Sequence, residues 1–246
     1  MKVGSLFSGI GGIDLGLQRA GMEIAWQCEK DPWCRRILTK HWPEVPKYED
    51  VQTLDAATVE PVDMLAGGFP CQDLSVAGKR AGLREGTRSG LWLEFARLIR
   101  ALRPKYVLVE NVPGLLANHA LGRVLGDLAE CGYDAEWENI PASALGAPHR
   151  RERVWIVAYP KQGMRQSRRI PYFNDVPFLS DWEGASEVYS LFCRGRSGPV
   201  NDRHSLRDDA GFPKELDRIA ALGNAVVPQI PEMIGYAILE AEKEKP

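Results

Sequence analysis

Cysteine is scarce in this sequence, and it is not arranged in the pairs that disulfide frameworks and structural metal sites use. The 246 residues include five cysteines, an odd number, without any C-x-x-C pair. This pattern argues against a disulfide-stabilised scaffold and against a four-ligand zinc site. We expect most of the thiols to be small buried side chains in a reducing compartment, and we predict no metal site.

An excess of charge of one sign is also missing, as is any long apolar run. The 31 Lys and Arg against 33 Asp and Glu give a formal net charge of −2. This balance argues against a histone-like basic binder, although a nucleic-acid enzyme can keep its positive charge local. No stretch approaches the roughly 20 apolar residues of a membrane-spanning helix. The sequence therefore predicts a cytoplasmic protein that does not engage a membrane.

The composition is that of a folded protein, with 44% hydrophobic and 26% charged residues, and up to residue 159 short apolar runs alternate with amphipathic stretches. In 91–102, for example, Leu91, Phe95, Leu98 and Leu102 recur at helical spacing. This alternation predicts an α/β fold, a doubly wound and mostly parallel sheet. Strands are expected at 1–7, 23–28, 62–66, 105–110 and 154–159, and helices at 12–20, 32–41, 91–102, 121–131 and 232–242.

The alternation stops at residue 160. Residues 160–215 are rich in Arg, Ser, Gly and Pro, with four aromatics between Tyr172 and Trp182. We interpret this stretch as a small irregular second domain. Periodicity returns at 216–222, and the helix expected at 232–242 should pack back onto the first domain. The predicted organisation is thus 1–159 plus 216–246 as one domain and 160–215 as the other.

A glycine-rich turn stands where the first strand meets the first helix. The segment 5–12 (SLFSGIGG) allows a tight turn and close approach of a ligand to the backbone. Glu29 follows Gly9 by twenty residues, where an acid binds ribose hydroxyls in nucleotide-binding folds. Asp14 occupies a place where the NAD fingerprint needs a small residue, which disfavours an NAD oxidoreductase. An adenosine without phosphates, as in S-adenosylmethionine, fits better, and Asp50 could accept a hydrogen bond from its adenine amino group.

Reactive side chains follow other predicted strands, at the strand ends where open α/β sheets bind ligands. Cys71 comes after GGFP, in which Pro70 stiffens the step before the thiol, and a thiol with a pKa of about 8.5 remains nucleophilic near neutrality. Glu110 ends another strand, and a carboxyl beside an apolar wall can stay protonated. Arg151 and Arg153 lie on one side of an entering strand, a pairing that suits a phosphate or a pyrimidine carbonyl.

Taken together, these motifs resemble those of the C5-cytosine DNA methyltransferases. FSGIGG, GGFPCQ, ENVPG, HRRER and ALGNAVVP occur in the order and approximate spacing of that family, and the resemblance covers nearly the whole chain outside 160–212. It implies a Rossmann-like class I methyltransferase fold with S-adenosylmethionine as cofactor. It also implies a compact prokaryotic or phage-like enzyme that acts as a monomer on double-stranded DNA, with any cognate restriction endonuclease acting separately.

The resemblance assigns a role to each matching residue. Cys71 would attack C6 of a cytosine flipped out of the duplex, Glu110 would hydrogen-bond N3 and the exocyclic amine, and Arg151 and Arg153 would hold the base or its flanking phosphate. His149 stands where many members have Gln. The expected cofactor-binding residues are Phe7, Gly9, Gly11, Gly12, Glu29, Asp50, Val51, Pro70, Leu91, Asn224 and Val226. The expected DNA-binding residues are Gln72, Ser75, Lys79, Arg80, Arg84, Arg88, Arg165, Arg168 and Arg169.

Two other functions stay open at this point. A related tRNA-modifying group shares the catalytic segments, so the substrate could be RNA. A catalytically silent DNA-binding relative is the other alternative, although such a chain could freely lose Cys71, Glu110, Arg151 and Arg153. Residues 160–215 are expected to be a small target-recognition domain that reads a short site, and the alternative is a partly ordered loop.

Overall fold

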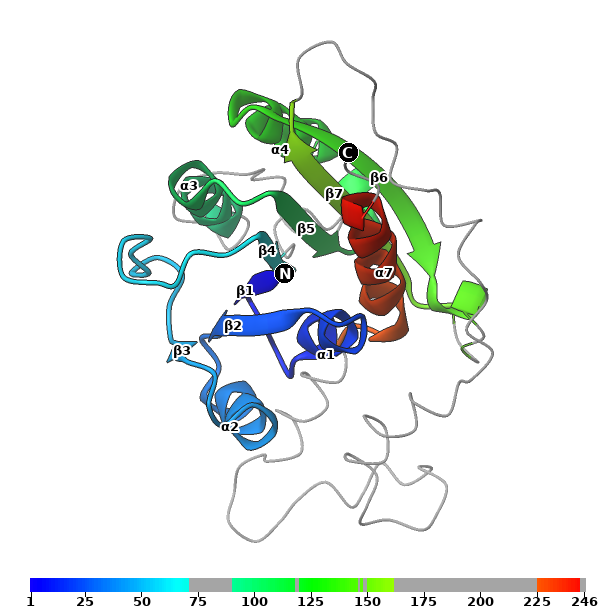
Figure 1. Cartoon of the computed structure of the whole chain (residues 1–246). Helices are drawn as coiled ribbons and strands as arrows, with labels where there is room; N and C mark the ends of the chain where they lie inside the picture. Colours follow the sequence, from blue (N-terminus) through cyan, green and yellow to red (C-terminus); the bar gives the residue numbers. More distant parts are fainter. Residues whose placement is uncertain (71–89, 118–119, 146, 148–149, 162–224, 244–246) are drawn as a thin grey trace, which may run out of the picture.

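The computed structural model describes residues 1–70, 90–117, 120–145, 147, 150–161 and 225–243. Within them a single mixed sheet has the strand order β3-β2-β1-β4-β5-β7-β6 (Figure 1). Strands β1 to β5 run parallel, and β7 is antiparallel to both of its neighbours. The strands are β1 (Lys2–Leu6), β2 (Glu23–Cys28), β3 (Lys47–Tyr48), β4 (Met64–Gly67), β5 (Tyr106–Asn111), β6 (Tyr133–Pro141) and β7 (Glu152–Pro160).

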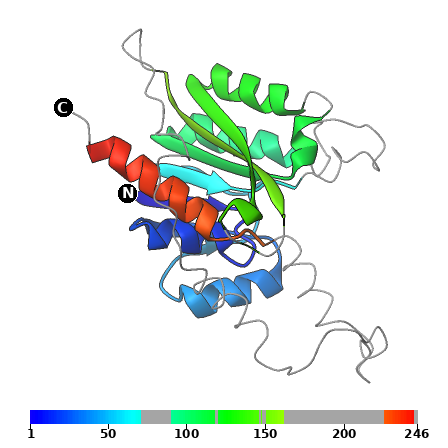
Figure 2. The ribbon, with the colours of Figure 1, turned by 90° about the vertical axis from the view of Figure 1, so that its right-hand side faces the viewer.

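Helices cover both faces of this sheet. From β1 the chain moves outward through β2 to β3, and from β4 it moves the other way to β5, so the sheet is doubly wound. Helices α1 and α7 lie together on one face, and α3 and α4 lie on the other (Figure 2). The α/β architecture predicted from the sequence is thereby confirmed. The α-helices are α1 (Gly12–Arg19), α2 (Pro32–His41), α3 (Leu91–Leu102), α4 (Ala120–Glu130) and α7 (Gln229–Lys243).

Helix α2 shows how the local sequence determines where a helix begins. The Asp31 carboxylate accepts a hydrogen bond from the Cys34 backbone N–H at 2.9 Å, which satisfies one of the donors that a helix start leaves free. Pro32 occupies the first turn, where its fixed φ suits a helix and its missing N–H is not needed. The predicted range 32–41 is therefore the observed one.

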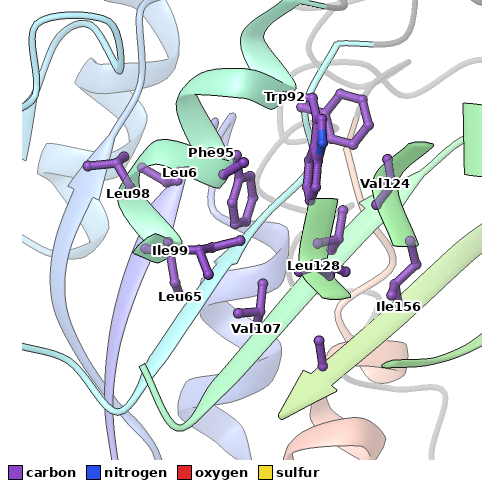
Figure 3. Packing of buried hydrophobic residues seen from close by; sticks show 14 of the residues in the cluster. Leu6, Leu65, Trp92, Phe95, Leu98, Ile99, Val107, Val124, Leu128 and Ile156 are labelled. Atoms are coloured by element: carbon purple, nitrogen blue, oxygen red, sulfur yellow. The ribbon is translucent and has the colours of Figure 1, made fainter. Parts of the chain in front are cut away.

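The buried face of α3 differs from the predicted one at four positions, because Trp92 and Ile99 are buried whereas Leu91 and Leu102 are only half-buried. Phe95 and Leu98 are buried as expected (Figure 3). The indole N–H of Trp92 donates to Asp127 at 2.8 Å, so this large side chain turns inward between α3 and α4. The polar end of the ring thus has a partner inside the core.

Strand β6 was not expected from the sequence. It pairs with β7 along its whole length at the edge of the sheet. Of its nine residues only Tyr133 and Ile140 are buried. Asp134, Glu136 and Glu138 alternate with Tyr133, Ala135 and Trp137, which is the period-2 pattern of a strand with one apolar and one charged face. A charged face of this kind is typical of an edge strand.

Helix α7 packs closely against α1. A Cβ added at Gly16 would lie 2.2 Å from the carbonyl oxygen of Pro228, and one added at Gly235 would lie 2.7 Å from the Cβ of Ala20. Only glycine permits this approach. None of the described helices is both long and apolar enough to span a membrane. Nearly all of 160–215 lies outside the described residues, so the division into two domains stays a prediction.

Candidate active site

The described candidate residues gather at one edge of the sheet, formed by the carboxyl ends of the parallel strands. Arg153 joins them because β7 is antiparallel and begins at this edge, where Val154 pairs with Asn111. The residues at the ends of β1, β2, β3, β4 and β5 are Phe7 to Gly12, Glu29, Asp50 with Val51, Pro70, and Glu110. The candidates outside the described residues are Cys71, Gln72, Ser75, Lys79, Arg80, Arg84, Arg88, His149, Arg165, Arg168, Arg169 and Asn224, and their roles stay predictions.

The glycine turn combines an unusual backbone with a nearby acid. Phe7, Gly9 and Gly11 have φ values of 51°, 55° and 86°. The Gly9 N–H donates to Oε2 of Glu29 at 2.7 Å, and a Cβ added at Gly9 would meet no described atom within 4 Å. Burial raises the pKa of Glu29, opposed by the backbone N–H groups of Asp31 and Gly9. An open space over a glycine, beside a carboxylate that can accept hydrogen bonds from hydroxyl groups, fits the ribose and amino-acid parts of S-adenosylmethionine.

Three other segments border this turn. Val226 lies so close that a Cβ added at Gly12 would be 2.7 Å from its carbonyl oxygen, which brings the start of the C-terminal helix segment to the turn. The ring of Phe7 stacks on Phe95 of α3, with centroids 6.5 Å apart. Asp50 pairs with Lys30 at 2.8 Å at the rim. Glu29 after β2 and Val226 of the C-terminal segment thus meet at the turn that follows β1, and Asp50 lies beyond the end of β3, the strand that pairs with β2.

A buried ion pair occupies the neighbouring part of the edge. Nε of Arg153 lies 2.8 Å from Oε1 of Glu110, and the two side chains are 15% and 11% exposed. Burial raises the pKa of Glu110 to about 7, against the opposing charges of Arg153 and Arg151. Glu110 can therefore both hold and release a proton near neutral pH, as a general acid or base must.

The GGFP segment packs directly against Glu110 and its neighbour. A Cβ added at Gly68 would lie 2.5 Å from Oε2 of Glu110, so only glycine leaves room for the carboxylate. The side-chain amide of Asn111 donates to the carbonyl oxygen of Phe69 at 3.0 Å, which fixes the backbone two residues before position 71. Asn111 was not among the residues predicted for the site. The signal for it was a second polar residue directly after Glu110, at the end of an otherwise apolar strand.

The raised pKa values predict how folding stability depends on pH. Glu110, with a pKa of about 7 in the fold against 4.5 ordinarily, and Asp14, about 6 against 3.8, keep protons that the unfolded chain releases. Because the folded state then binds more protons, stability falls as pH rises from about 4.5 to 7. His41, whose pKa burial lowers, acts in the opposite direction. We expect the free energy of urea unfolding to be about 2 kcal/mol higher at pH 5.5 than at pH 8, and a flat profile would contradict these assignments.

Comparisons with known proteins agree with the motifs. The profile of the family described as C-5 cytosine-specific DNA methylase matches residues 1–183. The chain is 41% identical over 165 residues to the Type II methyltransferase M2.BsuMI of Bacillus subtilis (strain 168), which covers 64% of this chain and 42% of that protein. It is 33% identical over 217 residues to the Type II methyltransferase M.MspI of Moraxella sp, covering 87% and 50%. The chain spans about half the length of the curated relatives it matches.

Solved structures share the fold. A prophage-encoded Escherichia coli protein assigned as a DNA modification methyltransferase superposes with a TM-score of 0.55 at 29% identity, over 65% of this chain and 47% of that one. The Dnmt2 methyltransferase of S. pombe gives 0.57 at 22% identity, over 75% and 57%, a likeness of fold alone. The sheet is thus the Rossmann-like class I methyltransferase fold predicted from the sequence. Because the family profile matches most of its length, the chain belongs to the C-5 cytosine-specific DNA methylase family.

Proposed function

We propose that this chain is a DNA (cytosine-5-)-methyltransferase that uses S-adenosylmethionine. The observation that carries the proposal is the buried Glu110–Arg153 pair, packed against the segment that leads to Cys71 and placed on the same sheet edge as the glycine turn. Membership of the family supports the reaction type. The proposal includes action as a monomer in the cytoplasm, and a separately acting endonuclease where the enzyme belongs to a restriction–modification system.

The cofactor, when bound, supplies an electrophilic methyl group on a sulfonium. Glu29 would hold the ribose hydroxyls, because its half-buried carboxylate already accepts a backbone N–H beside the open space over Gly9. Phe7 would lie against the adenine, and Asp50 with Val51 would meet the adenine edge. The remaining pocket residues are proposed to be Gly11, Gly12, Pro70, Leu91, Asn224 and Val226.

Cytosine is a poor electrophile at C6, so this chain must activate the ring as the nucleophile adds. The Cys71 thiolate would form an S–C6 bond, and the displaced electron pair would move through the ring as N3 takes a proton from Glu110. A pKa of about 7 makes that proton available near neutral pH. Arg153, already within 2.8 Å, would then stabilise the carboxylate that remains.

Product formation reverses these two steps. C5 would share its electron pair with the methyl group as the methyl–sulfonium bond breaks and leaves its electrons on sulfur. C5 would then lose its proton to solvent, and that C–H electron pair would re-form the C5–C6 double bond as the Cys71 thiolate leaves C6. N3 returns its proton to Glu110, so the enzyme ends in its starting state. The target base must leave the helix stack for this chemistry, which costs a few kcal/mol. Contacts from the proposed DNA-binding residues at 72–88 and 165–169 would offset that cost.

Gly68→Ala should disable the chemical step without unfolding the protein. The new Cβ would overlap Oε2 of Glu110 and displace the carboxylate, so we expect methyl transfer to fall roughly 10²-fold, with little change in cofactor affinity. Single-turnover rates and cofactor Kd measure the two effects. Gly126→Ala in α4 is the matched control, because an added Cβ there meets no described atom within 4 Å. Equal activity of the two variants would contradict the placement of Glu110.

Methyl transfer from labelled S-adenosylmethionine tests the proposed function. Unmethylated duplex DNA of mixed sequence and an RNA transcript of the same sequence are offered separately to the purified chain. We expect incorporation into the duplex. Incorporation into RNA alone would establish the RNA alternative. Cofactor binding without incorporation into either would favour the catalytically silent DNA-binding relative.

A further inference from the structure

A carboxylate is buried beneath the glycine turn, within a small cluster of buried polar side chains. Asp14, in the first turn of α1, is fully buried. Its Oδ1 accepts from the Gln27 side-chain amide at 2.7 Å, and its Oδ2 accepts from Ser5 Oγ at 3.0 Å. Ser5 and Gln27 are register partners on β1 and β2. A leucine would fill such a position without the cost of desolvating a charge, so the carboxylate requires an explanation.

The hydrogen bonds continue from Asp14 to the turn itself. Ser5 Oγ lies 2.8 Å from Ser8 Oγ, and because the one Ser5 hydroxyl proton is directed to Asp14, Ser8 is the donor in this contact. The backbone carbonyls of Ser5 and Cys28 lie farther from Ser8 Oγ, at 3.3 and 3.5 Å. The Ser8 backbone is fixed as well, since its N–H donates to the Cys28 carbonyl at 3.2 Å and its carbonyl accepts from Gly11 at 2.8 Å. Ser8 is therefore the point at which the buried network holds the turn.

The residue before Ser8 needs such support. Phe7, with a φ of 51°, is in the left-handed region that a residue with a Cβ rarely adopts. Such a conformation persists only where its surroundings impose it. The turn is held on its outer side by the Glu29 contact to Gly9 and on its inner side by Ser8.

We propose that Asp14 is a positioning residue for the cofactor, acting through Ser5 and Ser8 to hold Phe7 and Gly9 in the conformation that binds S-adenosylmethionine. The inference rests on the proposed function, which supplies the cofactor, and adds a residue that the sequence analysis used only to disfavour NAD. A turn fixed before binding avoids the loss of freedom that a loose turn would suffer on binding.

The buried charge of Asp14 should favour cofactor binding and lower the stability of the fold. Burial raises the pKa of Asp14 to about 6, with the Gln27 and Ser5 hydrogen bonds opposing it, so the charged form is unfavourable for folding at neutral pH. Asp14→Asn keeps the shape and removes the charge. We expect this variant to melt no lower than wild type at pH 8 without cofactor, while binding S-adenosylmethionine more weakly. A residue with a purely structural role would show the opposite pattern.

Titration calorimetry of S-adenosylmethionine into the full chain tests the inference. We expect Asp14→Asn and Ser5→Ala each to raise Kd roughly tenfold, the effect of losing about one charge-assisted hydrogen bond. The Kd of the double variant should be about the same as that of either single variant, because both side chains act through the same chain of hydrogen bonds. Asp127→Asn is the matched control: this buried aspartate accepts from Trp92 and Arg123 on the other face of the sheet, so the control should lower the melting temperature and leave Kd unchanged.

Each outcome has a definite meaning. A wild-type chain that does not bind S-adenosylmethionine overturns the proposed function itself, and this inference with it. Wild-type binding with an unchanged Kd for Asp14→Asn overturns the inference alone. Weaker binding by Asp14→Asn but not by Ser5→Ala also overturns it, because the carboxylate would then not act through Ser5. Fully additive effects in the double variant would mean that the two side chains act separately, which the inference does not allow.

Discussion

Replacing Cys71 by Ser should reduce methyl transfer by roughly 10⁴-fold or more while leaving cofactor binding nearly intact. A hydroxyl is far less nucleophilic than a thiolate near neutral pH, and loss of a covalent nucleophile has effects of about this size or larger in other enzymes. The role itself is inferred from the sequence, because Cys71 lies outside the described residues. Single-turnover transfer to duplex DNA and the Kd for S-adenosylmethionine measure the two effects independently.

Cys131→Ser provides the control for this change. Cys131 is buried, and it precedes Tyr133, which pairs with Pro160 at the opposite end of β7 from Arg153. We expect this variant to lose some stability and to keep its activity. Substantial turnover by the Cys71 variant, or an equal loss in both variants, would rule out the assignment of the nucleophile.

Glu110→Gln should slow the chemical step by about 10²–10⁴-fold, the usual contribution of one acid–base group, with a much smaller effect on DNA affinity. The glutamine amide can still accept a hydrogen bond from Arg153 and can still reach N3, but it cannot transfer a proton. Single-turnover rates give the first quantity and titration of labelled duplex DNA gives the second.

Glu138→Gln is the matched control for Glu110. In the sheet both residues pair with Trp155 of β7, from opposite sides, but Glu138 is exposed on the edge strand whereas Glu110 is buried. We expect wild-type rates from the Glu138 variant. If Glu110→Gln weakens DNA binding as much as it slows transfer, Glu110 is a structural residue and the proposed proton transfer is wrong.

Much of the fold can be predicted from the sequence because the local sequence signals agree with the tertiary packing. Helix α2 has the predicted bounds since Asp31 and Pro32 define its start locally. The apolar runs of β2 and β5 are buried in the sheet interior, so continuous hydrophobicity was sufficient to find them. The candidate site follows from the same strands, because the motifs come directly after them.

The remainder depends on contacts between distant residues. Strand β6 alternates apolar and acidic residues over only a few positions, and its place at the sheet edge is set by its pairing with β7. Trp92 turns inward because Asp127, 35 residues away, accepts its N–H. Asn111 gains its contact with Phe69 only when β4 and β5 are side by side. Asp14 has partners on two strands that no local pattern brings together.

Base-resolution mapping of methylation tests the central claim most directly. The chain and its Cys71→Ser variant are expressed in a host without cytosine methylation, and the host DNA is then analysed for modified bases and their positions. The account predicts 5-methylcytosine at one short recurring site with the wild-type chain and none with the variant. Methylation at a different atom or base, or the same pattern with both chains, would contradict it.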